Sequence, residues 1–338
     1  MAYRGRALYN LLQMNLKQNP SLEVESWQVE DYRTLSLEGL FERLEALEIF
    51  LDKDHFLLYV EECDSPQELA DCLCLEKNFN KHEQAFLAVF ELWRRLSPHK
   101  QSLSLFVDHL DHLIEEYEEG NLEEEEGLQS ALESFQRILD DNVDEGGEPE
   151  EGYELFSTYS CHDLEVFIYE YIAHQIDAEN RQYASELLGG FYPYVKNKGW
   201  FDLLSVRLVS EADPIEGKVM LERHLNSLRE EPDLYLLFET LHYLIHTEET
   251  EDFWRGYQQA LEELATEEDL RELLLLTAEY FSAEEKEKEE AYIEKLIDQQ
   301  KKNDPKAPIG KESGCLEELK QLITTLLKSD QSLDSLQR

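Results

Sequence analysis

The chain has 338 residues and carries 31 Lys and Arg against 76 Asp and Glu, which gives a formal net charge of −45. A field this negative repels nucleic-acid phosphates and anionic lipid surfaces, so the composition argues against direct nucleic-acid binding and favours a basic protein partner. The five cysteines have no regular spacing and do not indicate a disulfide framework. No apolar run of about 18 residues exists to span a membrane. We therefore expect a cytoplasmic protein.

The N-terminal part of the chain has the apolar spacing of three and four residues that is typical of helices. Residues 1–20 predict an amphipathic helix and not a signal peptide, because polar residues interrupt the apolar stretch. Ser65, Pro66 and Glu68 have the pattern of a capping box at the start of a later helix. Other helices are predicted from apolar stripes that begin at Leu37, Phe86 and Leu105. We predict an N-terminal helical domain over residues 1–144, with an acidic C-terminal segment.

An acidic linker is expected over residues 145–161. Asp and Glu dominate the chain from 115 to 154, and Gly146, Gly147 and Pro149 disfavour regular structure there. Asp140 begins an alternation of side-chain oxygens like that of a calcium loop. However, Glu145 stands where such a loop needs glycine for its sharp turn, so we do not expect a calcium site.

Beyond this linker, a pair of helices repeats every 34–36 residues between 162 and 300. Large apolar residues keep the same position in the first helix of each of four units, and a second set does so in the second helices. The first-helix columns are Leu164, Trp200, Leu234 and Leu270, then Phe167, Leu203, Leu237 and Leu273, then Ile168, Leu204, Phe238 and Leu274. The second-helix columns are Leu187, Leu221, Tyr257 and Ile293, then Phe191, Leu225, Leu261 and Ile297. A single hairpin cannot bury its apolar face alone, so this register predicts stacked hairpins that share a continuous core.

The end of the chain changes in composition. Residues 301–314 predict a linker, and apolar residues from Leu316 to Leu327 predict an amphipathic helix over 315–328. That helix either caps the last repeat, whose apolar face would otherwise be exposed, or docks on a partner.

The helix-pair period and the apolar columns resemble tetratricopeptide-type repeats over residues 162–298. Trp200 and Leu203 match the family pattern, whereas Leu204, Phe238 and Leu274 stand where the family has a small residue. The resemblance implies a right-handed superhelix, an α-solenoid, whose first helices line a concave groove for a peptide or a helix of a partner.

If that orientation holds, three columns of first-helix residues face the groove. They are Glu165, Phe201, Tyr235 and Arg271, then Tyr169, Ser205, Glu239 and Leu275, then Ala173, Val209, Tyr243 and Glu279. From these we predict a partner-binding set of Tyr169, Phe201, Tyr235, Glu239 and Tyr243. Aromatic rings beside carboxylates suit an apolar or basic segment, although such rings also commonly fill the space between repeats.

One cluster in the repeat has the residue types of a metal site. Glu239, His242 and His246 lie near one face of a predicted helix, but no further ligand can be identified from the sequence. Recognisable nucleophile and nucleotide-binding patterns are absent. We therefore expect no catalytic residues, no cofactor and no metal, and no enzyme activity.

The sequence thus predicts an all-α protein with an N-terminal helical domain, four helical hairpins and a C-terminal helix. Its expected function is non-catalytic binding of an apolar or basic segment of a partner protein, as an adaptor, scaffold or dedicated chaperone. Two alternatives remain. One is a metal-dependent enzyme or metalloprotein that uses Glu239, His242 and His246, and the other is an acidic nucleic-acid mimic that binds a basic DNA- or RNA-binding protein.

Overall fold

A computed structural model describes residues 3–74, 78–122, 124–247, 249–309 and 314–334. Over these residues the fold is all-α, as predicted, and its only β-type pairing is an isolated bridge between Thr266 and Pro308. The chain divides into two compact units, residues 1–196 and 197–338. In the described residues, no helix is both long and apolar enough to cross a membrane.

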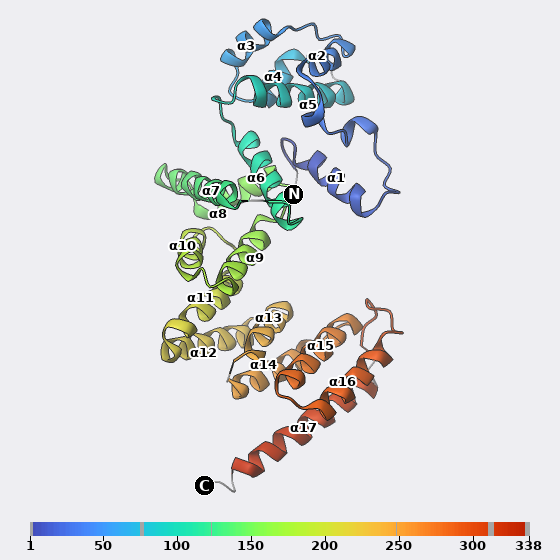
Figure 1. The fold of residues 1–338 in the computed structure, drawn as a ribbon, viewed down its shortest axis with the longest axis vertical. Helices are drawn as coiled ribbons and strands as arrows, with labels where there is room; N and C mark the ends of the chain where they lie inside the picture. Colours follow the sequence, from blue (N-terminus) through green and yellow to red (C-terminus); the bar gives the residue numbers. More distant parts are fainter. Residues whose placement is uncertain (1–2, 75–77, 123, 248, 310–313, 335–338) are drawn as a thin grey trace. The chain divides into compact units, whose positions relative to one another are not determined.

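The first unit begins with α1 and two short 3₁₀ helices, followed by a group of helices around one core (Figure 1). These elements are α1 (Ala7–Gln18), η1 (Ser26–Gln28), η2 (Tyr32–Thr34), α2 (Leu37–Ala46), α3 (Lys53–Glu62), α4 (Pro66–Leu73) and α5 (Phe79–Leu96). The predicted N-cap of α4 is confirmed, since Ser65 Oγ accepts from the amide of Glu68 at 3.2 Å. The other half of the capping box is wrong, because the Glu68 carboxylate accepts from the amide of Asp64 at 2.7 Å and not from that of Ser65. Helix α5 lies at the centre, with Phe90 and Trp93 fully buried, and contacts α2 and α4.

In the described residues, the rest of the first unit forms five helices. They are α6 (Leu103–Glu118), α7 (Glu126–Asp144), α8 (Pro149–Tyr159), α9 (Leu164–Asp177) and α10 (Arg181–Phe191). The expected linker over 145–161 is wrong, because most of it is α8. Tyr153 and Phe156 of α8 are buried against Phe135 of α7, with ring centroids 5.7 and 4.5 Å apart. Burial of these two rings outweighs the repulsion of the surrounding carboxylates.

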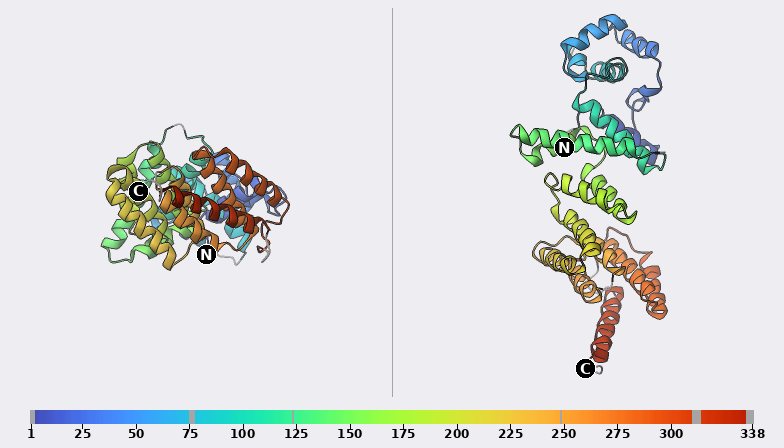
Figure 2. Two further views of the ribbon diagram at one scale, coloured as in Figure 1. Left: turned by 90° about the horizontal axis from the view of Figure 1, so that it is seen from below. Right: turned by 60° about the vertical axis from the view of Figure 1, so that its left-hand side comes forward.

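The second unit holds three of the four predicted hairpins and the C-terminal helix, and Figure 2 shows this succession in two further views. Its helices are α11 (Lys198–Ala212), α12 (Pro214–Glu230), α13 (Leu234–Ile245), α14 (Thr250–Glu263), α15 (Glu267–Ala283), α16 (Glu287–Gln300) and α17 (Gly314–Asp334). The first hairpin, α9 with α10, belongs to the first unit. Each first helix packs against its own second helix, and α13 also contacts both α11 and α15.

The apolar columns found in the sequence form the core of these hairpins. Leu203, Leu237 and Leu273 are all fully buried, as are Leu204 and Leu274. The large residues at the positions where tetratricopeptide repeats have small ones are therefore part of the packing between helices.

The C-terminal segment packs back on the second unit. Residues 301–309, expected as a linker, bond to the start of α15: the amide of Glu267 donates to the Ala307 carbonyl at 2.9 Å, and that of Ile309 donates to the Ala265 carbonyl at 3.0 Å. Residues 310–313 of the predicted linker lie outside the described residues. Helix α17 contacts α16 and buries Leu319 and Ile323 in the core, which supports the capping interpretation. The side chains of Leu326 and Leu327 lie outside the described residues.

Candidate functional site

Two of the five predicted partner-binding residues are not available at the surface. Tyr169 on α9 is 8% exposed and Phe201 on α11 is fully buried. Helix α9 is apolar on more than one face, so the repeat register alone could not separate its groove side from its core side. The assignment of these two residues to an open groove is therefore wrong.

The other three residues share one face of α13. Tyr235 is 67% exposed, whereas Glu239 and Tyr243 are half-buried. Their spacing of four residues places them along one stripe of a helix whose start is capped by Asp233, which accepts from the amide of Leu236 at 3.1 Å. Of the five predicted partner-binding residues, these three remain at the surface.

The histidines of α13 meet a carboxylate that comes from the next hairpin. Glu279 of α15 places one carboxylate oxygen 3.3 Å from Nδ1 of His242 and the other 3.4 Å from Nε2 of His246. The structure thus changes the predicted cluster, because the third donor is Glu279 and not Glu239. Donor atoms of the three side chains lie within 4.8 Å of one another.

A second cluster joins Asp111 of α6 to Cys161 and His162 in the turn before α9. Asp111 accepts from the Ser160 hydroxyl at 2.6 Å and from the Cys161 amide at 2.9 Å, and it lies 3.1 Å from Nδ1 of His162. Sγ of Cys161 approaches this same nitrogen at 3.4 Å. A Cys–His nucleophile needs separate nitrogens for the thiol and for the orienting carboxylate, so this geometry does not favour one.

The electrostatics of this second cluster also disfavour a reactive thiol. Burial and the neighbouring Asp111 charge raise the pKa of the Cys161 thiol above its ordinary value. Burial alone would lower the pKa of His162, but its hydrogen bond to Asp111 and the Asp111 charge raise it overall. The contacts of Asp111 with Ser160, Cys161 and His162 fasten the α8–α9 turn to α6.

An open surface feature lies in the first unit, between α2 and α3, where the sequence predicted no site. The chain leaves α2 through a Schellman-type turn: Glu48 has a φ of 63°, its amide donates to the Glu45 carbonyl, and the Ile49 amide donates to the Leu44 carbonyl. Ile49 is buried by this turn, and the next residue, Phe50, is 76% exposed. The turn is what presents the Phe50 ring to solvent.

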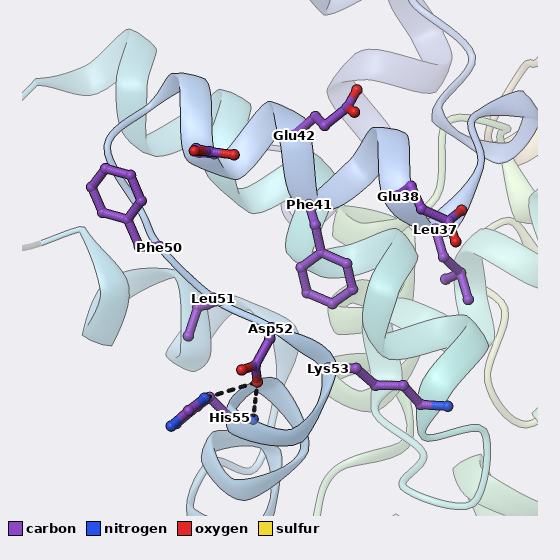
Figure 3. A pocket seen from close by; sticks show the side chains of 10 residues that line it. Leu37, Glu38, Phe41, Glu42, Phe50, Leu51, Asp52, Lys53 and His55 are labelled. Atoms are coloured by element: carbon purple, nitrogen blue, oxygen red, sulfur yellow. Dashed lines mark hydrogen bonds and ion pairs between the residues drawn. The ribbon is translucent and has the colours of Figure 1, made fainter.

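Helix α3 then closes the other side of this feature. Asp52 caps the helix by accepting from the amide of His55 at 2.9 Å, and it also contacts Nδ1 of His55 at 2.8 Å. Phe41 projects from α2 toward the segment that carries Leu51 and Asp52 (Figure 3). Beneath it, the Phe41 ring packs edge-on against the fully buried Phe56, with centroids 6.2 Å apart.

We name this feature the α2–α3 groove. Its volume is about 690 Å³, and it is lined by Leu37, Glu38, Phe41, Glu42, Glu45, Phe50, Leu51, Asp52, Lys53 and His55 (Figure 3). Its apolar side chains are exposed or only partly buried, and four carboxylates surround them against one lysine and one histidine. The groove can therefore hold apolar side chains while its rim attracts positive charge.

The sequence carried one signal for this groove. The apolar run Ile49-Phe50-Leu51 falls between two helices, where a loop is ordinarily polar, and this alone could have marked Phe50 as unusual. Glu279 had a signal as well, since it occupies the same repeat column as Tyr243. Comparison with known proteins adds no homologous site: no family model, no curated protein and no solved structure matches this chain.

Proposed function

We propose that this chain is a non-catalytic interaction protein that binds a basic, amphipathic helix of a partner protein in the α2–α3 groove. The observation that carries the proposal is the groove itself, where exposed Phe50 and half-buried Phe41 and Leu51 form an apolar surface within a rim of carboxylates. A helix with apolar residues on one face and lysines or arginines beside them is complementary to both parts.

The charge of the chain supports the choice of a basic partner. Glu38, Glu42 and Glu45 lie at spacings of four and three along α2, so their carboxylates follow one side of the groove. The net charge of −45 adds a long-range attraction that accelerates encounter with a cationic protein. An adaptor, a scaffold or a dedicated chaperone in the cytoplasm would use such a surface.

The proposal can be tested with a defined probe, a fluorescein-labelled amphipathic peptide of leucine and lysine, by fluorescence anisotropy on the full chain. We expect Phe50→Ala to weaken binding by about tenfold or more, as for a buried aromatic anchor of an interface. A peptide in which glutamate replaces lysine should not bind, because it meets like charge.

Two exposed aromatic residues provide matched controls. Phe79 is 70% exposed but does not line the groove, and Tyr235, at 67%, belongs to the α13 stripe. Phe79→Ala should bind the peptide as the wild type does. If Tyr235→Ala weakened binding and Phe50→Ala did not, the binding surface would be the stripe on α13 and the groove assignment would be wrong. Equal binding by all three variants would indicate only diffuse attraction to a negative surface and would refute both surfaces.

A further inference from the structure

The two histidines on α13 are held as a pair. His242 and His246 are four residues apart, one turn of helix, so both side chains leave the same face. Their rings are nearly perpendicular, at 89°, with centroids 5.6 Å apart. Histidines in this spacing can direct one nitrogen each toward a common point, as in metal sites built on a single helix.

Glu279 completes the arrangement from a second helix. Its carboxylate oxygens lie 3.3 and 3.4 Å from the facing nitrogens of His242 and His246. Donor atoms about 2.0–2.1 Å from a tetrahedral zinc ion lie about 3.3–3.4 Å from one another, and each of the two nitrogen–oxygen separations has this length, one to each oxygen of Glu279. With one donor atom taken from each of the three side chains, all three atoms lie within 4.8 Å of one another. The contact between α13 and α15 brings the three side chains together, although Glu279 is 37 residues after His242 and 33 after His246.

The surroundings favour a cation. His242, His246 and Glu279 have side chains that are 52, 63 and 39% exposed, so an ion can enter from solvent and retain water as a further ligand. Two imidazoles and one carboxylate are borderline ligands, which select zinc and its transition-metal neighbours over magnesium or calcium. By contrast, Asp111 in the other cluster is buried and already accepts from a hydroxyl and a backbone amide.

We propose that His242, His246 and Glu279 bind one divalent transition-metal ion of the zinc type, with the remaining coordination position open to water or to a donor from a partner. The ion would link the first helices of two successive hairpins, α13 and α15, in the second unit. This site is independent of the α2–α3 groove and of the function proposed for it.

The test uses the full chain without a histidine tag, in the presence of a phosphine reductant, and titrates it with zinc chloride in a calorimeter. We expect one site per chain in the wild type. Glu279→Gln and His246→Asn should each weaken that site by at least about tenfold, because even changes outside the ligand set of a metal commonly do so. Zinc should also raise the thermal unfolding midpoint of the wild type more than that of either variant.

A matched control is His55, which pairs with Asp52 at 2.8 Å on the surface and, in the part of the chain that the structure describes, belongs to no group of three metal-ligating side chains. His55→Asn should leave the zinc stoichiometry and affinity unchanged. Circular dichroism without metal should be the same for all four proteins, since the three substituted side chains are exposed or half-buried. Absence of stoichiometric zinc binding in the wild type, or undiminished binding in Glu279→Gln and His246→Asn, would overturn the proposal.

Discussion

Nε2 of His224 on α12 lies 2.9 Å from Oγ1 of Thr240 on α13, and both residues are buried. Thr240 donates its hydroxyl proton to the Leu236 carbonyl at 2.7 Å, so its oxygen accepts from Nε2–H of the histidine. Burial disfavours the charged imidazolium and lowers the pKa of His224 to about 4. The charge of Asp202 acts in the opposite direction but does not offset the effect of burial. The ring is therefore neutral and fixed in one tautomer in the folded protein.

This relationship predicts a loss of stability in mild acid. In the unfolded chain a histidine has a pKa near 6.5. The contribution of neutral His224 to the free energy of unfolding is therefore complete above pH 6.5 and is lost as the pH falls toward 4. Between pH 7 and pH 5 the loss should be about 2 kcal/mol, at about 1.4 kcal/mol for each pH unit below 6.5. Urea unfolding of the second unit as a function of pH measures it. His224→Leu should flatten the profile in this range, and an equally steep profile in that variant would assign the acid sensitivity to other groups.

A second prediction concerns Asp108 in the first unit, which joins α6 to α1 and η2. Its carboxylate accepts from Arg33 at 2.7 Å and from Asn10 at 2.9 Å, and Arg6 lies 3.8 Å away. Asp108→Asn leaves buried guanidinium charge without compensation, so it should destabilise the first unit by about 3–5 kcal/mol. Chemical denaturation of the full chain, followed with a probe in the first unit, checks this value.

The control for Asp108 is an exposed ion pair. Lys17 and Glu115 are 2.5 Å apart at the surface, and Glu115→Gln should change stability by less than about 1 kcal/mol. Burial by itself would raise the pKa of Asp108, but Arg6 and Arg33 lower it below the ordinary 3.8. The contribution of ionised Asp108 to the free energy of unfolding is thus present above pH 3.8 and is lost only as the pH falls below that value. Equal effects of Asp108→Asn and Glu115→Gln would show that the buried network is not stabilising.

A third prediction separates the two roles considered for α17. Leu319 is fully buried in the core of the second unit, so Leu319→Ala should destabilise that unit by about 2–5 kcal/mol if the helix is a permanent cap. Leu275 on α15, 46% exposed, is the control, and Leu275→Ala should have an effect of about 0.5 kcal/mol or less. Thermal unfolding of both variants decides between the roles. A negligible effect of Leu319→Ala would mean that α17 detaches readily and serves to dock on a partner.

The sequence by itself determined the all-α class and the order of the paired helices in the repeat, but not α8. Helix caps and apolar stripes depend on neighbours three or four residues away, so they can be recognised in the sequence without a structure. Examples are the cap at Ser65 and the column of Leu203, Leu237 and Leu273. The orientation implied by the resemblance to tetratricopeptide-type repeats placed Tyr235 on an open face, and Tyr235 is 67% exposed on α13. The expected orientation failed where several faces of one helix are apolar, as at Tyr169, because periodicity cannot then distinguish the buried faces from an open one.

Only the tertiary structure decided which distant residues meet. Helix α8 forms within an acidic stretch because its Phe156 packs against Phe135 of α7. The number of charges along the chain does not reveal the stabilisation that this burial provides. Glu279 joins His242 and His246 because the contact of α13 with α15 sets the rotation of each helix about its axis. Phe50 is exposed because one left-handed residue, Glu48, directs the chain away from the core. These outcomes depend on packing between elements, and the spacing of residues within one element does not specify them.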